Sequence, residues 1–462
     1  MTSQTQEFYS GYKPQTIKIM QKFDVKIWDR IEITTSKGKA QGVVLPRNKF
    51  APDGFIEIKL KNGYNIGIPV DESSNIKVLG TVPPMKVSFE QKTLPHNKKL
   101  PTVKLIGTGG TIASRLDYTT GAVIPAFEPG ELFTAVPELA EISNIETEVV
   151  FQLLSENLSP QNWLELAKKI VSIAKSEIDG IIIAHGTDTL SFTAAALSFL
   201  LKNVSIPIVL VGSQRSSDRP SSDAALNLIN AVKVASEANL GEVVVCMLGS
   251  SAHDYGFIHR GTRVRKMHSS ARHTFRSIGA SPLGMVRNQI ITYFSPDYNP
   301  RNKNNLSKMD FWPKIEDKVA LIYSHPGMQS DVLDFYINNG YKGIVFAGSG
   351  LGHLPKTMFP ALKRAQQAEI PVLMTVQTIW GYTGMDVYES GRELLELGVI
   401  PGKNMLPEVA FAKMCWALGN FEGYNKVKEI LTTNIAGEIT LGEPMNGFMV
   451  LQGVEDKILP LK

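Results

Sequence analysis

The chain has 462 residues, more than one compact hydrophobic core usually holds, so we expect two or three domains. Hydrophobic residues make up 43% and charged residues 20%, an ordinary globular composition that argues against a disordered chain. Only Cys246 and Cys415 are present, too few for a disulfide framework or a cysteine-based structural zinc site. Because the start is polar and no apolar run approaches the roughly 20 residues of a membrane span, we expect a soluble, cytoplasmic protein.

The formal net charge of +4 is unevenly distributed along the chain. Residues 1–100 contain 16 Lys or Arg and 9 Asp or Glu, a balance of +7. Residues 101–462 contain 32 and 35, a balance of −3. A basic leading module therefore precedes a mildly acidic body.

The leading module has the pattern of a small all-β domain. Residues 25–80 contain five short strand-like runs separated by turn formers such as Lys61-Asn62-Gly63, which is typical of a small β-barrel. We assign residues 1–85 to this barrel. Residues 86–101 are polar and basic with two prolines, and we interpret them as a linker.

The body alternates strand and helix patterns, which predicts an α/β fold with mostly parallel sheets. We divide it into an N-terminal catalytic domain, residues 102–305, and a C-terminal domain, residues 306–462, with an irregular segment at 288–313. Strands are expected near residues 103–106, 180–184, 206–211, 242–248, 318–323, 343–346 and 371–376, and helices near 190–201, 223–237, 331–339, 356–369 and 386–397.

A Gly-rich segment, GTGGTIAS at 107–114, directly follows the first of these strands. It is not a dinucleotide loop, since Ile112 stands where that motif needs glycine, and it is not a phosphate-binding P-loop, since no Gly-Lys-Ser/Thr follows. What remains is a flexible backbone that lets a threonine hydroxyl and bare amides approach a small substrate.

Two further segments carry chemistry. HGTDT at 185–189 follows the strand at 180–184; its Asp and Thr either cap the next helix or line a site. The basic run at 263–270 is a solvated face, a phosphate-binding patch or, if Lys266 turns inward beside Asp188, the source of a base for a hydroxyl.

Together the three segments resemble one family, the bacterial-type L-asparaginases. Its signatures are a GGTIA loop and an HGTDT segment about 75 residues later, present here at 109–113 and 185–189, and Lys266 falls where the family keeps its catalytic lysine. The similarity extends from about residue 103 to the C-terminus. It implies a two-domain asparaginase-like α/β core and an amidohydrolase that uses a threonine nucleophile.

The basic barrel is absent from free asparaginases. It occurs in the asparaginase-like subunits of the archaeal tRNA-dependent amidotransferases, which form Gln-tRNA(Gln) from Glu-tRNA(Gln). Segments 117–123, 266–268, 348–353 and 386–392 are also similar to those subunits. The resemblance therefore implies a glutaminase that deamidates Gln, or Asn, and supplies ammonia for this ligase reaction.

The resemblance also assigns roles within the site. Thr111 is the implied nucleophile, Tyr118 lies on a lid near its hydroxyl, and Thr187 with Lys266 forms the other catalytic half. Asp188 is the fourth implied catalytic residue and binds the substrate's α-ammonium group. Ser155 and Glu156 help to hold the α-carboxyl and amino groups, and the backbone of Gly110 and Gly186 belongs to the implied substrate-binding set. Which threonine attacks first is left open.

The resemblance implies partners rather than cofactors for this chain. No cofactor and no metal are expected in it. The absence of P-loop and kinase signatures agrees with ATP being used by a separate chain. A separate partner chain, the E subunit of the amidotransferase, is expected to use ATP and Mg²⁺ to activate the glutamyl group on Glu-tRNA(Gln). The implied ATP-dependent assembly is a heterotetramer built on a homodimer of this chain, with no membrane contact.

Two alternatives stay open. The first is a free-standing L-asparaginase with an incidental N-terminal domain. The second is a non-catalytic nucleic-acid-binding protein, because small basic barrels with aromatic residues bind oligonucleotides. We favour core packing or protein docking for most aromatics of so small a barrel, so whether it contacts tRNA or the partner is not decided by the sequence.

Overall fold

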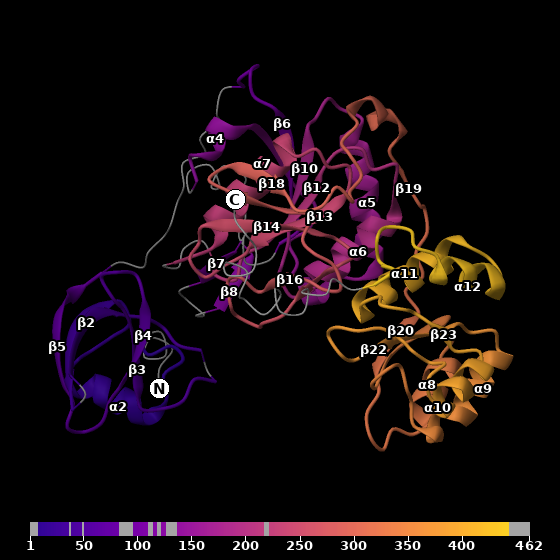
Figure 1. Cartoon of the computed structure of the whole chain (residues 1–462). Coiled ribbons are helices and arrows are strands. Elements are labelled where there is room, and N and C mark those ends of the chain that lie inside the picture. Colours follow the sequence, from indigo (N-terminus) through magenta and orange to yellow (C-terminus); the bar gives the residue numbers. More distant parts are fainter. Residues whose placement is uncertain are drawn as a thin grey trace.

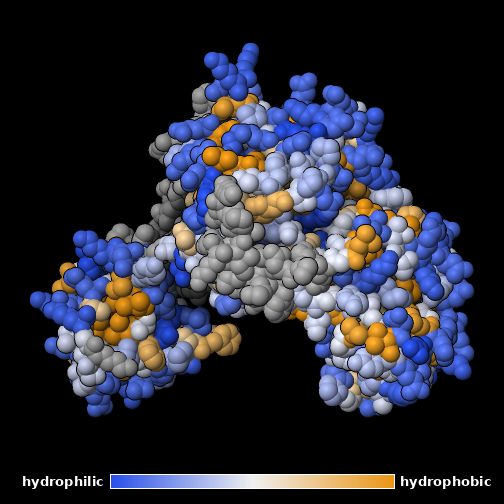
Figure 2. All heavy atoms as spheres, viewed as in Figure 1, coloured by the Kyte–Doolittle hydropathy of each residue, from blue (hydrophilic) through white to orange (hydrophobic). Residues whose placement is uncertain are grey.

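Figure 1 shows the computed structural model of the chain, in which an N-terminal unit stands beside a larger α/β body. The structure describes residues 8–36, 38–48, 50–82, 96–109, 114–117, 122–125, 136–216 and 221–442; at 114–117 and 122–125 only the backbone pairing is described. Figure 2 shows that hydrophilic residues cover most of the visible face, with small scattered apolar patches. Among the described residues, no helix is long and apolar enough to cross a membrane.

The N-terminal unit contains the five expected strands in one antiparallel sheet, ordered β4-β3-β2-β1-β5. These are β1 (Asp29–Thr35), β2 (Gly38–Val44), β3 (Phe55–Lys59), β4 (Asn65–Pro69) and β5 (Asn75–Thr81). The sequence analysis did not anticipate helix α2 (Pro14–Lys22). Its Lys13 N-cap gives no side-chain hydrogen bond, and the amide of Thr16 instead donates to the Asp53 carboxylate at 2.9 Å. A cap from 37 residues away leaves no local signal.

The aromatic residues of this unit are divided between core and surface. Tyr12 is buried and donates from its hydroxyl to the Leu45 carbonyl at 2.7 Å, while Tyr9 and Phe23 pack against the same core. Phe50 and Tyr64 are exposed by 82% and 41%. Core packing therefore accounts for several of these aromatic residues but not for all of them.

The unit that corresponds to the expected catalytic domain, called the catalytic unit below, is built on an eight-stranded sheet, ordered β18-β17-β14-β13-β12-β10-β6-β9. The five strands from β13 to β9 are parallel, and β14, β17 and β18 continue the sheet in antiparallel fashion. Their bounds are β6 (Thr102–Gly107), β9 (Asn144–Val149), β10 (Gly180–Ala184), β12 (Ile208–Val211), β13 (Val243–Leu248), β14 (Tyr255–Arg260), β17 (Gly284–Arg287) and β18 (Ile290–Tyr293).

The expectation of an irregular segment at 288–313 was wrong for its first part, because β18 lies there. Asn288 and Gln289 form the turn between β17 and β18 with φ of +50° and +61°. Positive φ at both central residues is the hairpin geometry that Asn-Gly usually signals. With glutamine in the second place, that signal is missing from the sequence.

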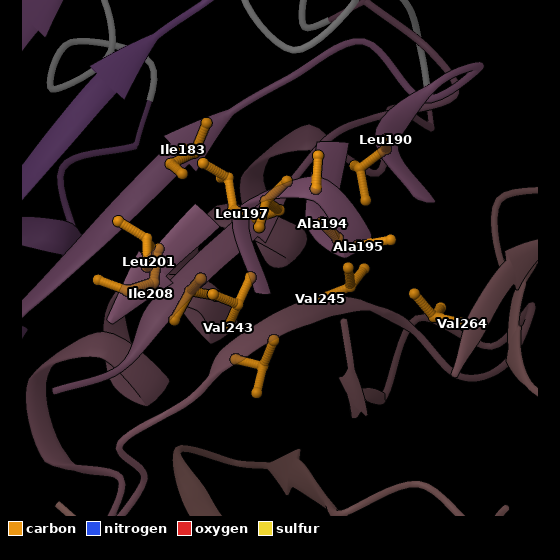
Figure 3. Close-up of a cluster of buried hydrophobic side chains, with 14 of the residues drawn as sticks. Ile183, Leu190, Ala194, Ala195, Leu197, Leu201, Ile208, Val243, Val245 and Val264 are labelled. Atoms are coloured by element: carbon orange, nitrogen blue, oxygen red, sulfur yellow. The ribbon is translucent and has the colours of Figure 1, made fainter. Parts of the chain in front are cut away.

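Helices and short strand pairs complete the catalytic unit. The helices are α4 (Leu139–Ile142), α5 (Pro160–Ala174), α6 (Leu190–Leu200) and α7 (Ala224–Glu237), with short 3₁₀ turns η2 (Ser155–Asn157) and η3 (Lys303–Lys308). The pairs are β7 (Ser114–Asp117) with β8 (Ala122–Pro125), β11 (Leu201–Lys202) with β19 (Asp310–Phe311), and β15 (Val264–Lys266) with β16 (Phe275–Ser277). Helix α6 is mostly apolar and almost entirely buried, and Figure 3 shows its Leu190, Ala194 and Leu197 in one hydrophobic cluster with Ile183 and Val245.

The C-terminal unit has a four-stranded parallel sheet, ordered β20-β21-β22-β23, with helices on both faces (Figure 1). Alternate residues of β21 enter different cores: Ile344 and Phe346 pack with α8–α10, and Val345 packs with α11. The elements are β20 (Val319–Tyr323), α8 (Asp331–Asn338), β21 (Gly343–Gly348), η4 (Lys356–Met358), α9 (Phe359–Gln367), β22 (Val372–Val376), α10 (Glu389–Glu396), β23 (Ile400–Pro401), α11 (Pro407–Asn420) and α12 (Tyr424–Thr432).

Helix α11 joins one face of the C-terminal sheet to the hydrophobic core of the catalytic unit. It packs on the C-terminal sheet and also against α6 of the catalytic unit. Phe199 of α6 and Trp416 of α11 are both buried and stack with ring centroids 5.6 Å apart. The two α/β units therefore share one core, while the other face of the C-terminal sheet has a core of its own.

We expect Trp416→Ala to lower the free energy of unfolding by about 3–5 kcal/mol, because it leaves a cavity between the units. Ile290→Ala on β18, at a side chain 67% exposed, is the control and is expected to change that free energy by less than about 0.5 kcal/mol. Urea unfolding of the full chain measures both. Equal effects of the two substitutions would contradict the shared core.

Candidate functional site

Two loops meet at the carboxyl ends of neighbouring parallel strands. Strands β6 and β10 pair in parallel with Gly107 opposite Ala184, so the loops that follow them start side by side. Thr108 joins these loops, because its amide and its hydroxyl both donate to the Ala184 carbonyl, at 3.0 and 2.9 Å. Loops at this edge of a parallel sheet are the usual place for a ligand.

Gly109 is required by the backbone at the start of the first loop. Its φ is +103°, in the region that favours glycine, and a Cβ there would lie 2.2 Å from the Leu153 carbonyl oxygen. The close approach to residue 153 continues in a hydrogen bond from the Leu153 amide to the Thr108 carbonyl, at 3.3 Å. Glycine here lets the loop pass directly over the chain that follows β9.

Lys266 reaches the second loop from a distant part of the chain. It ends β15, which pairs with β16 as a two-stranded hairpin outside the main sheet. Its Nζ donates to Thr187 Oγ1 at 2.9 Å and to Asp188 Oδ1 at 2.8 Å, over 79 and 78 positions of sequence. The structure therefore brings together three of the four residues that the sequence analysis proposed as catalytic.

The three side chains differ in their exposure. Thr187 is 5% exposed and the Lys266 side chain 13%, whereas the Asp188 side chain is 68% exposed. A hydrogen bond from a largely buried ammonium to a buried hydroxyl favours negative charge on that oxygen. The Asp188 carboxylate faces outward, where a cationic ligand group can approach it.

The hairpin that carries Lys266 is held by the C-terminal unit. Arg263 is 1% exposed, and its Nη1 donates to the carbonyls of Asn404 and Glu438 at 2.9 and 3.0 Å. Arg265 approaches the Glu408 carboxylate of α11 to within 3.6 Å, and Lys266 follows in the chain. The interpretation of this basic run as a solvated face is wrong for Arg263, because its guanidinium is a buried anchor.

Ser155 and Glu156, the two other proposed substrate ligands, lie on η2 beside the second loop. The hydroxyl of Thr189 donates to the Ser155 carbonyl at 2.8 Å, which fixes η2 against that loop. Ser155 is buried and Glu156 is exposed. Their proposed contacts with substrate remain predictions.

Gly110, Thr111 and Tyr118 lie outside the described residues, and their proposed roles remain predictions. Gly186 lies in the described loop between His185 and Thr187. No group of three or more His, Cys, Asp or Glu side chains that suits a metal ion occurs among the described residues.

A buried polar chain lies directly beneath the HGTDT loop, and the sequence analysis gave its members no role. The Trp163 indole donates to Thr193 Oγ1 at 3.0 Å, and that oxygen lies 2.8 Å from His185 Nε2. His185 Nδ1 lies 2.7 Å from the Gly186 carbonyl oxygen. Complete burial lowers the pKa of His185 to about 4, against a smaller opposing effect of the carbonyl. The sequence contained no signal for this chain, since Trp163 comes from α5 and Thr193 from α6.

Comparison with known proteins extends over nearly the whole chain. Residues 102–298 match the family model "Asparaginase, N-terminal", residues 318–431 match "Glutaminase/Asparaginase C-terminal domain", and residues 25–79 match "GatD N-terminal domain". A curated relative from Thermococcus kodakarensis, named as the D subunit of glutamyl-tRNA(Gln) amidotransferase, is 44% identical over 93% of this chain and 98% of its own length. A relative of the same name from Methanopyrus kandleri is 41% identical over 97% and 99%.

Solved asparaginase structures are similar to a large part of this chain. The thermostable L-asparaginase from Thermococcus kodakarensis superposes with a TM-score of 0.65 at 32% identity, covering 73% of this chain and 99% of that one. A probable cytoplasmic L-asparaginase from Campylobacter jejuni has a TM-score of 0.61 at 29% identity, covering 72% and 100%. These asparaginases are covered almost completely although more than a quarter of this chain has no counterpart in them.

We expect Gly109→Ala to reduce amidase activity and to lower the free energy of unfolding, with the clash alone contributing about 1–3 kcal/mol. The control is Gly327→Ala, which has a similar positive φ of +80° but no atom within 4 Å of the new Cβ. Gly327→Ala is expected to lower the free energy of unfolding only by the cost of a positive φ in alanine, about 1–2 kcal/mol, and to leave activity unchanged. Thermal unfolding and an ammonia assay of both variants measure this, and equal activity losses would contradict the close approach at Leu153.

Proposed function

The chain belongs to the D-subunit family of the glutamyl-tRNA(Gln) amidotransferases, and we propose that it deamidates Gln, or Asn, and supplies the ammonia that converts Glu-tRNA(Gln) to Gln-tRNA(Gln). The asparaginase-type matches over residues 102–298 and 318–431 and the names of its relatives support this proposal. The observation that carries it is the contact of Lys266 Nζ with both Thr187 Oγ1 and Asp188 Oδ1.

In the proposed reaction, a threonine hydroxyl attacks the side-chain amide carbon and forms an acyl-enzyme. The hydroxyl proton passes to the amide nitrogen, which leaves as ammonia, and water then hydrolyses the ester. Thr111, in the loop after β6, is the first candidate for the nucleophile, with Tyr118 polarising its hydroxyl. The pairing of β6 with β10 supports this assignment, since the chain leaves β6 at Thr108, whose hydroxyl donates to the Ala184 carbonyl just before the HGTDT loop.

Thr187 and Lys266 form the second half of the proposed machinery. The Lys266 ammonium stabilises negative charge on Thr187 Oγ1, or on a water bound there, at a site with little solvent access. The order in which Thr111 and Thr187 act is not part of the proposal. Residues that act as one unit give single-substitution effects that do not add, so both threonines are required.

The solvent-facing side of the proposed site binds the charged end of the substrate. Asp188 binds the α-ammonium group, which its exposed carboxylate suits, and Ser155 with Glu156 holds the α-carboxyl and amino groups. The backbone amides of Gly110 and Gly186 are the proposed donors to the reacting carbonyl oxygen. Helix α6 begins at Leu190, two residues after Asp188, and its N-terminal amides add positive potential for the developing oxyanion.

The ammonia acceptor in this proposal is a separate chain. The E subunit, with ATP and Mg²⁺, activates the glutamyl group of Glu-tRNA(Gln) and receives the ammonia. This chain contributes no cofactor of its own and forms a homodimer within a cytoplasmic heterotetramer. The match of residues 25–79 to a GatD-type domain supports the assignment, because it lies outside residues 102–298 and 318–431, which match the asparaginase-type models.

We expect Lys266→Ala and Thr187→Ala each to lower kcat for ammonia release from Gln by about 10²–10⁴-fold, because each removes a group that acts on the reacting hydroxyl. Lys233→Ala is the matched control: its side chain is 15% exposed, close to the 13% of Lys266, and pairs with Glu237 on α7. That variant is expected to retain wild-type kcat. Wild-type release of ammonia by both site variants would rule out the proposed machinery.

We expect ammonia release from Gln to rise when the chain is mixed with the E subunit, ATP, Mg²⁺ and Glu-tRNA(Gln), and the ammonia to appear as Gln-tRNA(Gln). The measurement follows ammonia and aminoacyl-tRNA together, with uncharged tRNA as the control. Efficient asparagine hydrolysis by the lone chain, unchanged by the partner, would favour a free-standing L-asparaginase instead.

A further inference from the structure

We propose that His185 is a positioning residue for the amide hydrolysis, with its Nδ1–H holding the Gly186–Thr187 peptide so that the Thr187 amide faces the reacting group. This inference rests on the proposed function and deepens it. It concerns a side chain at 0% exposure that makes no hydrogen bond to Thr187, Asp188 or Lys266 side chains among the described contacts.

The direction of each hydrogen bond in the buried chain follows from the chemistry of its ends. A carbonyl oxygen only accepts, so the 2.7 Å contact with Gly186 requires a hydrogen on His185 Nδ1. The alternative tautomer would place two lone pairs against each other. A neutral imidazole has one N–H, so Nε2 accepts, and the Thr193 hydroxyl must donate to it. The Trp163 indole N–H, which can only donate, then donates a hydrogen bond to the oxygen of the Thr193 hydroxyl.

The imidazole is held neutral by its surroundings. It is completely buried, and no carboxylate is among its hydrogen-bond partners in the described structure. Burial keeps its pKa near 4, so the ring carries a single N–H at neutral pH. One donor at Nδ1 and one acceptor at Nε2 therefore define a single tautomer in the folded protein.

The hydrogen bond from His185 to the Gly186 carbonyl orients the peptide unit that carries the Thr187 amide. The bond between Gly186 and Thr187 is trans, so the Thr187 N–H points away from the Gly186 carbonyl and hence away from His185. Among the described residues, no atom accepts a hydrogen bond from the Thr187 amide, although the residue is 5% exposed. Buried amides are nearly always paired, so this donor is free for an oxygen of the substrate or its tetrahedral intermediate.

Two substitutions separate the two ends of the imidazole. His185→Asn places an amide N–H near the position of Nδ1 and retains a donor for the Gly186 carbonyl. His185→Gln places its amide near the position of Nε2, so it keeps a partner for Thr193 and loses the donor to Gly186. The two variants have similar polarity, so a difference between their kcat values measures the effect of the hydrogen bond to the Gly186 carbonyl.

We expect His185→Gln to lower kcat for ammonia release from Gln by about 100-fold with little change in KM, as for loss of one aligned oxyanion donor. His185→Asn is expected to stay within about tenfold of wild type. Thr193→Val, which removes the hydroxyl that selects the tautomer, lowers kcat more than Thr193→Ser does. Rates are expressed per folded enzyme, measured by circular dichroism, so that a loss of folded protein is not counted as a loss of kcat.

A second measurement needs no variant to be active. Two-bond ¹H–¹⁵N correlation spectra of histidine-labelled full-length protein identify which ring nitrogen is protonated, and the resonance absent from His185→Asn assigns His185. We expect the Nδ1–H tautomer. An Nε2–H tautomer in the wild type, or equal kcat for the Asn and Gln variants, overturns the positioning role.

The two proposals fail in different ways. If the wild type releases no ammonia from Gln or Asn, the proposed function fails and the positioning role falls with it, whatever the tautomer. If the wild type is active and the Asn and Gln variants retain equal kcat, only the role of His185 fails. If the His185 variants do not fold, the comparison of Thr193→Val with Thr193→Ser decides, since equal kcat of these two variants refutes the proposal and a lower kcat of Thr193→Val supports it.

Discussion

The contact of the Lys266 ammonium with Thr187 and Asp188 is the interaction on which the organisation of this site depends. It joins the HGTDT loop to a hairpin 79 positions later, and little water reaches its Lys266–Thr187 part, whereas the Asp188 carboxylate is exposed. An ammonium in that position stabilises an oxyanion only if its supporting backbone is fixed. Much of the surrounding structure serves to fix it.

That support comes from both α/β units. Arg263 anchors the hairpin by donating to carbonyls of the C-terminal unit, and one of these belongs to Glu438, whose carboxylate forms a fully buried ion pair with Lys413 of α11 at 2.6 Å. Helix α11 packs on α6, which begins directly after the HGTDT loop. The position of Lys266 is therefore coupled to the packing of a helix that begins about 140 residues later in the chain.

Local pattern predicted most of the fold. Alternating apolar strands and helices located β6, β10, β12, β13, α6 and α7, because continuous apolar runs bounded by glycine identify buried elements without tertiary information. The failures were non-local or unusual in their chemistry. Helix α2 is capped by Asp53 from another segment, and the β17–β18 hairpin turns at Asn288 and Gln289 instead of Asn-Gly. The core that the two α/β units share was not predicted either, because its residues lie far apart in the sequence.

The sequence alone determined the residue types of the site, since GGTIA, HGTDT and Lys266 are local strings whose chemistry and family likeness need no coordinates. Tertiary structure decided which of these residues are in contact, which side chains are buried and which are exposed to solvent. It also decided the polarity of the Trp163–Thr193–His185 chain, because a hydrogen bond's direction depends on which donors and acceptors meet in space. Trp163, Thr193 and His185 lie on α5, on α6 and directly after β10, so no short segment of the sequence predicts that they are in contact.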